Sequence, residues 1–135
     1  MTEFVIGSTN FGVDPNKSSF KLSTTPDGRV LLDIDIKGDQ STFDALDTAE
    51  EWEWSWTIYP PRFYCFTELG RVAKSQNLTM QFTADEIESA EMAIYLMNHN
   101  DVSDVILTIC ENTFTVSGNV DMMGQFAPFR IEWSQ

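Results

Sequence analysis

The segment TADEIESAEMAIYLMN, residues Thr83–Asn98, is the only clear helical pattern in a chain dominated by strand signals, so it decides the predicted fold class. Thr83 and Glu86 stand at the spacing of a capping box, in which each side chain bonds the backbone N–H of the other. Acidic residues follow in the first turn, where a helix favours negative charge. The apolar stripe at helical spacing consists of Ile87, Ala90, Ala93, Ile94 and Met97. We therefore predict one helix over residues 84–98.

Strand patterns surround this segment. Arg29–Lys37 alternates apolar and polar residues, and the turn-forming run Pro26-Asp27-Gly28 precedes it. The other strand-like segments are Phe4–Gly7, Ser18–Thr24, Glu51–Ile58, Arg62–Thr67, Asn77–Phe82, Asp104–Cys110, Thr113–Ser117 and Phe126–Trp133. Many strands around one helix predict an α+β fold. We expect one domain over residues 1–135, with a mainly antiparallel sheet of about 7–8 strands and the helix packed on one face.

The chain is strongly acidic. Its 135 residues carry 21 Asp and Glu against 8 Lys and Arg, which gives a formal net charge of -13. No Lys or Arg occurs between Gly38 and Pro61, or between Ser75 and Phe129. Such a surface repels nucleic acid and anionic membranes and speeds encounters with basic proteins. The charge therefore predicts a basic protein partner and no binding to nucleic acid or membrane.

No catalytic or metal-binding motif accompanies this charge. The sequence holds no nucleophile elbow, phosphate-binding glycine loop or dinucleotide fingerprint, and its one histidine, His99, follows the helical segment in a polar run. One His and two Cys do not form a zinc cluster of the usual spacing. Asp33, Asp35 and Asp39 match a calcium loop poorly and fit the wet face of a strand better. We predict a non-enzymatic protein without metal or cofactor.

The cysteines and the N-terminus bear on location. Cys65 and Cys110 lie in apolar, strand-like segments, so we predict two unbridged thiols in the core. The N-terminus has no basic region followed by an apolar run, and no stretch reaches the ~20 apolar residues of a membrane span. These features favour a cytoplasmic protein, in which an open edge strand would allow a homo-oligomer.

Trp52, Trp54 and Trp56 recur at the period of a strand, so their indoles share one face. Three interpretations are open: a packed core face, an exposed anchor for a protein partner, or a stacking platform for a sugar. Glu51 and Glu53 occupy the opposite, polar face. After this strand, Tyr59 precedes a diproline turn that we expect to leave a tyrosine near the surface.

The outer face of the predicted helix combines acids with Met92 and Tyr95. Acidic residues around a small apolar centre suit a protein interface, although an ordinary solvated acidic face has the same composition. The predicted partner-binding residues are Glu51, Glu53, Tyr59, Asp85, Glu88, Glu91, Met92 and Tyr95.

In composition and layout the chain resembles the small acidic immunity proteins that neutralise bacterial toxins. The resemblance implies a toxin domain as the partner, such as a nuclease with a basic cleft. Two alternatives are open. One is a carbohydrate-binding or carboxylate-pair glycosidase domain that uses the tryptophan face. The other is a nucleic-acid mimic whose carboxylates imitate phosphates.

Overall fold

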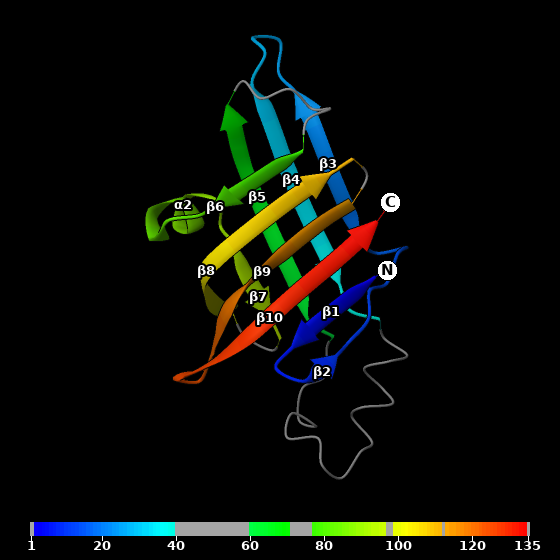
Figure 1. Cartoon of the computed structure of the whole chain (residues 1–135), viewed down its shortest axis with the longest axis vertical. Helices are drawn as coiled ribbons and strands as arrows, with labels where there is room; N and C mark the ends of the chain where they lie inside the picture. The colour runs from blue at the N-terminus through cyan, green and yellow to red at the C-terminus, as the bar shows by residue number, and fades with distance from the viewer. Residues whose placement is uncertain (1, 40–59, 71–76, 97–98, 112, 135) are drawn as a thin grey trace.

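The computed structural model describes residues 2–39, 60–70, 77–96, 99–111 and 113–134 (Figure 1). Within these ranges the chain forms ten strands and one short helix. In chain order they are β1 (Glu3–Ile6), β2 (Thr9–Asn10), β3 (Ser19–Thr24), β4 (Val30–Lys37), β5 (Arg62–Gly70), β6 (Leu78–Gln81), α2 (Ala84–Ser89), β7 (Ala93–Tyr95), β8 (His99–Cys110), β9 (Thr113–Met122) and β10 (Gln125–Ser134).

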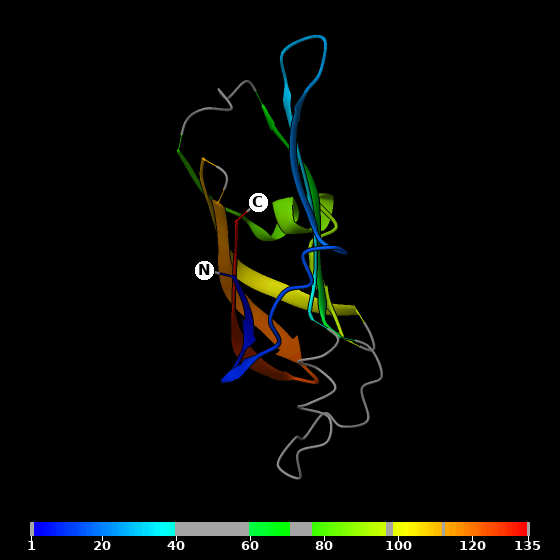
Figure 2. The same ribbon diagram turned by 90° about the vertical axis from the view of Figure 1, so that its right-hand side faces the viewer.

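The ten strands form one antiparallel sheet that folds back on itself. Its order is β2-β1-β10-β9-β8-β7-β5-β4-β3, and β6 pairs with β8 outside this path. Strand β8 links the two halves: its first residues pair with β7, its last residues pair with β6, and β9 runs along its other edge. Seen edge-on, β3, β4 and β5 lie in one layer and β1, β9 and β10 in the other (Figure 2). The sheet therefore curls into a half-barrel around its core.

Alternating side chains build this core. Every second residue of β4 is buried, from Val30 to Ile36, and this confirms the alternation predicted for Arg29–Lys37. Aromatic contacts join the two layers. Phe20 on β3 stacks on Phe114 of β9, with ring centroids 5.0 Å apart, and Phe63 on β5 lies 6.0 Å from Phe129 on β10. Neither pair belongs to neighbouring strands, so these rings hold the halves of the curled sheet together.

The predicted helix over residues 84–98 is wrong in length, and with it the predicted α+β fold. The capping box at Thr83 is confirmed, but α2 has only six residues. The chain then turns and continues as β7, where Ala93 and Ile94 are fully buried and pair with both β5 and β8. Adjacent apolar residues suit a buried strand as well as a helix. Hydrogen bonding on both edges of β7 favoured the strand, and the fold is mostly β.

The turn predicted at Pro26-Asp27-Gly28 is confirmed, and a second tight turn joins β8 to β9. β3 and β4 pair up to Thr24 and Val30 around a turn that contains Gly28, whose φ is 87°. β8 and β9 pair up to Cys110 and Thr113, and Glu111 opens the turn with a φ of 56°. Local turn chemistry was therefore a reliable guide to the register of these strands.

The two cysteines are both free, but only one lies in the core. Cys65 is buried on β5, and burial raises the pKa of its thiol to about 12, with a smaller contribution from the nearby Asp33 carboxylate. Cys110 is exposed at the end of β8, so its predicted place in the core is wrong. The side chains of a strand alternate between faces, and Ile109 takes the inward position.

We expect a thiol reagent to modify Cys110 and not Cys65 in the folded protein near pH ~8, and to modify both after unfolding, because the thiolate is the reactive form. The free energy of unfolding should also fall as the pH rises from about 9 toward 12. In that window the unfolded thiol has lost its proton while the folded thiol keeps it, so the unfolded state binds fewer protons. Thiol titration and urea denaturation at several pH values check both points. Reaction of both thiols without denaturant would contradict the buried position of Cys65, and Cys65→Ala should remove that part of the pH dependence.

Candidate functional site

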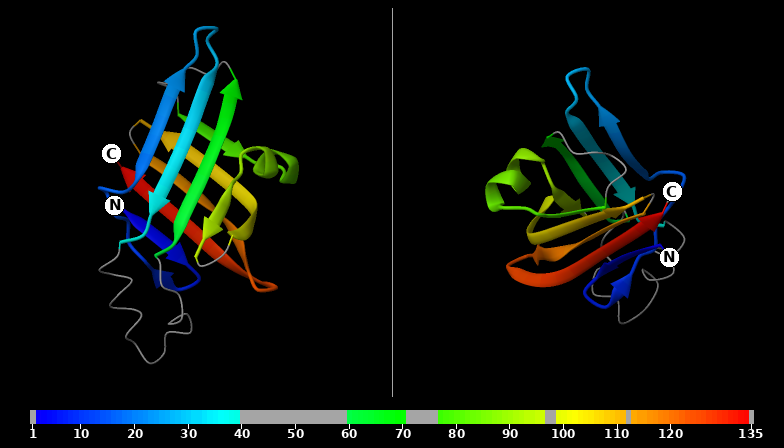
Figure 3. Two further views of the ribbon diagram at one scale, coloured as in Figure 1. Left: turned by 180° about the vertical axis from the view of Figure 1, so that it is seen from behind. Right: turned by 45° about the horizontal axis from the view of Figure 1, so that its top comes forward.

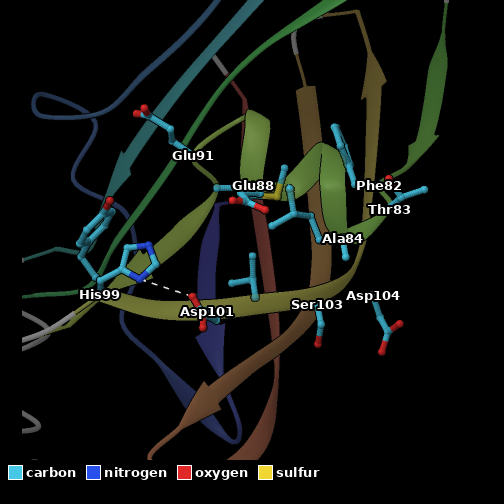
Figure 4. Close-up of a pocket in the computed structure, with 13 residues that line it drawn as sticks. Phe82, Thr83, Ala84, Glu88, Glu91, His99, Asp101, Ser103 and Asp104 are labelled. Atoms are coloured by element: carbon cyan, nitrogen blue, oxygen red, sulfur yellow. Dashed lines mark ion pairs between the residues drawn. The ribbon is translucent and has the colours of Figure 1, made fainter.

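A groove with a volume of about 900 Å³ lies between α2 and the first half of β8 (Figure 4). Four carboxylates line it: Glu88 and Glu91 come from the α2 segment, and Asp101 and Asp104 come from β8. Figure 4 shows Glu91 and Asp104 toward opposite ends, with Glu88 and Asp101 between them. None of the described residues that line the groove is Lys or Arg. We call this feature the acidic groove.

The end of α2 places the first two carboxylates. The backbone N–H of Glu91 donates to the carbonyl oxygen of Glu88 (3.1 Å), and that of Met92 donates to the carbonyl oxygen of Ile87 (3.1 Å). These two bonds form a Schellman motif, which commonly has glycine where Glu91 stands, because the backbone there is left-handed. Glu91 adopts this conformation with a φ of 52°. The fold alone would therefore favour another residue at this position.

Glu88 is also poorly suited to its local position. It lies in the last turn of α2, where unpaired carbonyl groups favour positive charge, and that turn contains no basic residue. The acids in the first turn, Asp85 and Glu86, follow the usual rule. The two carboxylates at the end of α2 are thus unfavourable for the helix, and a contact outside the helix would explain them better than helix stability does.

On β8, an irregularity in the sheet turns the side chain of Asp104 toward β9 at the edge of the groove. The register between β8 and β9 shifts between Ser103 and Ile106, and Asp104 has a φ of 52°. Gly118 on β9 lies against this bulge, with no room for a Cβ: the Ser103 carbonyl oxygen would be 2.8 Å from it. Asn119 donates a hydrogen bond from Nδ2 to Oδ2 of Asp104 (3.3 Å). A β-bulge redirects a side chain in this way.

Aromatic residues border the groove at the start of β8. The imidazole of His99 meets the ring of Tyr95 edge to face, with centroids 5.3 Å apart, and His99 Nδ1 lies 3.5 Å from Asp101 Oδ1. Arg62 lies over the same tyrosine, 5.8 Å from the ring centroid, and over Tyr64 at 5.3 Å. The acidic groove therefore ends in an aromatic cluster.

Arg62, the arginine of this cluster, forms an ion pair with Asp35. Arg62 donates from Nε and Nη2 to the two carboxylate oxygens of Asp35, at 2.7 and 2.9 Å, and this hydrogen bonding is the main cause that raises the pKa of Arg62. Desolvation raises the pKa of the Tyr64 hydroxyl, and the charges of Asp33 and Glu91 add to this. Tyr64 is therefore within electrostatic reach of Glu91, a lining residue of the acidic groove.

The described arginines neutralise acids elsewhere on the molecule. Arg29 pairs with Asp27 and Glu68, and Arg130 pairs with Glu3 and Glu132. Within the described part of the chain, no Lys or Arg forms an ion pair with a carboxylate of the acidic groove. Of the four carboxylates, Asp101 has His99 beside it and Asp104 accepts a hydrogen bond from Asn119.

The structure brings some of the predicted site residues together and separates others. Glu88, Glu91 and Tyr95 line the groove, whereas Asp85 lies on the first turn of α2 and is not a lining residue. Met92 lines the groove only from the core side: it is 3 % exposed, so its predicted place on an exposed helix face is wrong. The turn at Glu91 ends the helix and directs the next side chain inward.

Several other predicted residues lie outside the described ranges. These are Glu51, Glu53 and Tyr59, together with Trp52, Trp54 and Trp56. The tryptophan face and its three interpretations remain predictions.

Sequence reasoning missed the β8 half of the site. Asp101 fell between the predicted helix and the next predicted strand, and Asp104 at the start of that strand, although β8 begins at His99. The signal that was present is the alternation of His99 and Asp101, which puts both side chains on one face of a strand. The long helix predicted before them concealed it.

No known protein family, curated protein or solved structure matches this chain. Among the described residues, no three or more His, Cys, Asp or Glu side chains are grouped to hold a metal ion. The described helix is too short to span a membrane.

Proposed function

We propose that this protein is a non-enzymatic binding module that holds a basic segment of a protein partner in the acidic groove. The observation that carries the proposal is that four carboxylates from the α2 segment and β8 line one groove, while the described arginines pair with other carboxylates. Charge-assisted hydrogen bonds from Lys or Arg to carboxylates are among the stronger polar contacts in proteins.

The local backbone supports a role in binding. Glu91 and Asp104 both have left-handed backbone, and Glu88 stands at the unfavourable end of a helix. Residues in rare conformations cluster at functional sites, where another benefit offsets their cost. In this protein the benefit is the concentration of negative charge in the acidic groove.

The specific form of this proposal is an immunity-type inhibitor that neutralises a basic bacterial toxin by direct binding. A net charge of -13 supports fast association with a basic surface, and groove contacts then slow release. Two free thiols are compatible with the reducing cytoplasm as the place of action. An inhibitor of this kind needs no catalytic group of its own.

The test compares two double variants that remove the same amount of charge. Glu88→Gln with Glu91→Gln alters the groove, whereas Asp85→Asn with Glu111→Gln alters exposed acids outside it. The probe is a short fluorescent peptide of Lys and Arg, followed by anisotropy at low salt. We expect the groove variant to bind about tenfold more weakly, because it loses charge-assisted contacts, and the control to change far less. Equal losses in both variants would show that only net charge matters and would contradict the proposal.

A third variant separates binding from folding. Glu91→Gly removes the carboxylate and relieves the left-handed backbone, so it should raise the free energy of unfolding by about 0.5–1 kcal/mol while it weakens peptide binding. Urea denaturation and the same anisotropy assay measure the two effects. A less stable protein, or unchanged binding, would contradict a functional reason for Glu91.

A further inference from the structure

The turn between β9 and β10 presents two large apolar side chains to solvent. Met123 is 90 % exposed and Phe126 is 68 % exposed, the highest values among the large hydrophobic residues that the structure describes. Met122 pairs with Gln125 across the turn, and Asp121 accepts a hydrogen bond through Oδ1 from the backbone N–H of Gly124 (2.7 Å). The turn is therefore held in one shape. We call Met123 and Phe126 the apolar tip.

Local structure does not account for the apolar tip. Met123 and Gly124 have φ values of 58° and 92°, as in the two-residue turns that favour Asn-Gly. A methionine does not stabilise this left-handed backbone, and a side chain as exposed as that of Met123 contributes little to the core. An exposed apolar pair on a rigid turn is typical of an interaction site.

The apolar tip lies at the end of β9, the strand that pairs with β8. Val120 of β9 pairs with Val102 of β8, next to Asp101, so the β9–β10 turn extends beyond the strand that lines the groove. Asp104 lines the groove and also a second hollow of about 400 Å³, which includes Pro128 of β10. Two views of the molecule place this turn and α2 at the same side of the sheet (Figures 1 and 3).

We propose that the apolar tip is the anchor of the same interface and enters an apolar pocket that Lys and Arg surround on the partner. This inference rests on the proposed function. The net charge of -13, with Asp121 in the turn itself, opposes an anionic bilayer and a second copy of this chain. It favours a basic protein surface. Apolar anchors surrounded by complementary charge dominate the affinity of many interfaces.

The test uses two synthetic peptides of equal length and equal Lys and Arg content, one with leucines where the other has serines. Wild-type protein should bind the leucine peptide about tenfold more tightly, since burying an apolar side chain contributes to affinity on this scale. Met123→Asn with Phe126→Ser should abolish this preference and leave affinity for the serine peptide unchanged. Its Tm should not fall, because asparagine suits the left-handed backbone.

Phe66→Ser is the matched control, because Phe66 is 44 % exposed on β5 and does not line the groove. It should keep the preference for leucine. The inference is overturned if the tip variant keeps the preference, if Phe66→Ser removes it equally, or if the wild-type tip binds zwitterionic vesicles instead. A failure of the proposed function would have a different signature. In that case Glu88→Gln with Glu91→Gln would bind the serine peptide as tightly as the wild-type protein does. The ratio of the affinities for the two peptides would still report on the apolar tip.

Discussion

Replacing Phe114 with alanine is expected to lower the free energy of unfolding by about 3–5 kcal/mol, the range for large aromatic side chains in a core. Phe114 lies on β9 and is fully buried. It stacks on Phe20 at an interplanar angle of 12° and meets Trp133 edge to face, with centroids 6.2 Å apart. The first contact crosses between the layers, so its loss leaves a cavity where the two halves of the sheet meet.

Urea denaturation measures this effect, and Phe126→Ala is its control. Phe126 is the same residue type but is largely exposed, so its removal should change stability by less than about 0.5 kcal/mol. A similar cost for both variants would show that Phe114 does not join the layers.

Adding one methyl group at Gly118 is expected to destabilise the protein by about 1–3 kcal/mol, the usual cost of overpacking. A Cβ at this position would meet the Ser103 carbonyl oxygen at 2.8 Å and the Phe129 ring at 3.0 Å. The first of these atoms belongs to the backbone and cannot rotate away. Gly118→Ala should therefore push the β8 bulge outward and displace Asp104 from its place in the acidic groove.

Gly7→Ala is the comparison for this variant, since Gly7 has open space around it and a φ of 61°. It carries only the cost of left-handed backbone, about 1–2 kcal/mol. Binding of the Lys and Arg peptide separates the two: Gly118→Ala should weaken it and Gly7→Ala should not. Unchanged peptide binding in Gly118→Ala would show that the bulge does not position the groove.

Local patterns were sufficient for part of the fold. The alternation in β4, the turn at Gly28 and the capping box at Thr83 all appear where the sequence predicts them. Each depends on residues that are close in the chain, through side-chain period, backbone preference or one short hydrogen bond. Such features need no knowledge of distant strands.

The same reasoning failed where two structures share one pattern. Residues 93–95 continue a helical stripe in the sequence but form the strand between β5 and β8. Because of this error, Met92 was predicted on an exposed helix face. The start of β8, which contains Asp101, was not predicted as a strand. Half of the acidic groove was missed because of a single wrong helix.

The sequence by itself determined the large negative charge and the long segments that contain acids but no Lys or Arg. It also determined the alternation of apolar and polar residues that is typical of an antiparallel sheet. Only the tertiary structure decided that Glu88 and Glu91 line one groove together with residues of β8. The physical reason is that β7 gains hydrogen bonds and burial from β5, which is distant in the chain, and from β8, which follows it directly. This gain exceeds the local preference for helix. Once β7 is a strand, α2 must end before it, at Ser89, and Glu88 and Glu91 then line the groove with residues of β8.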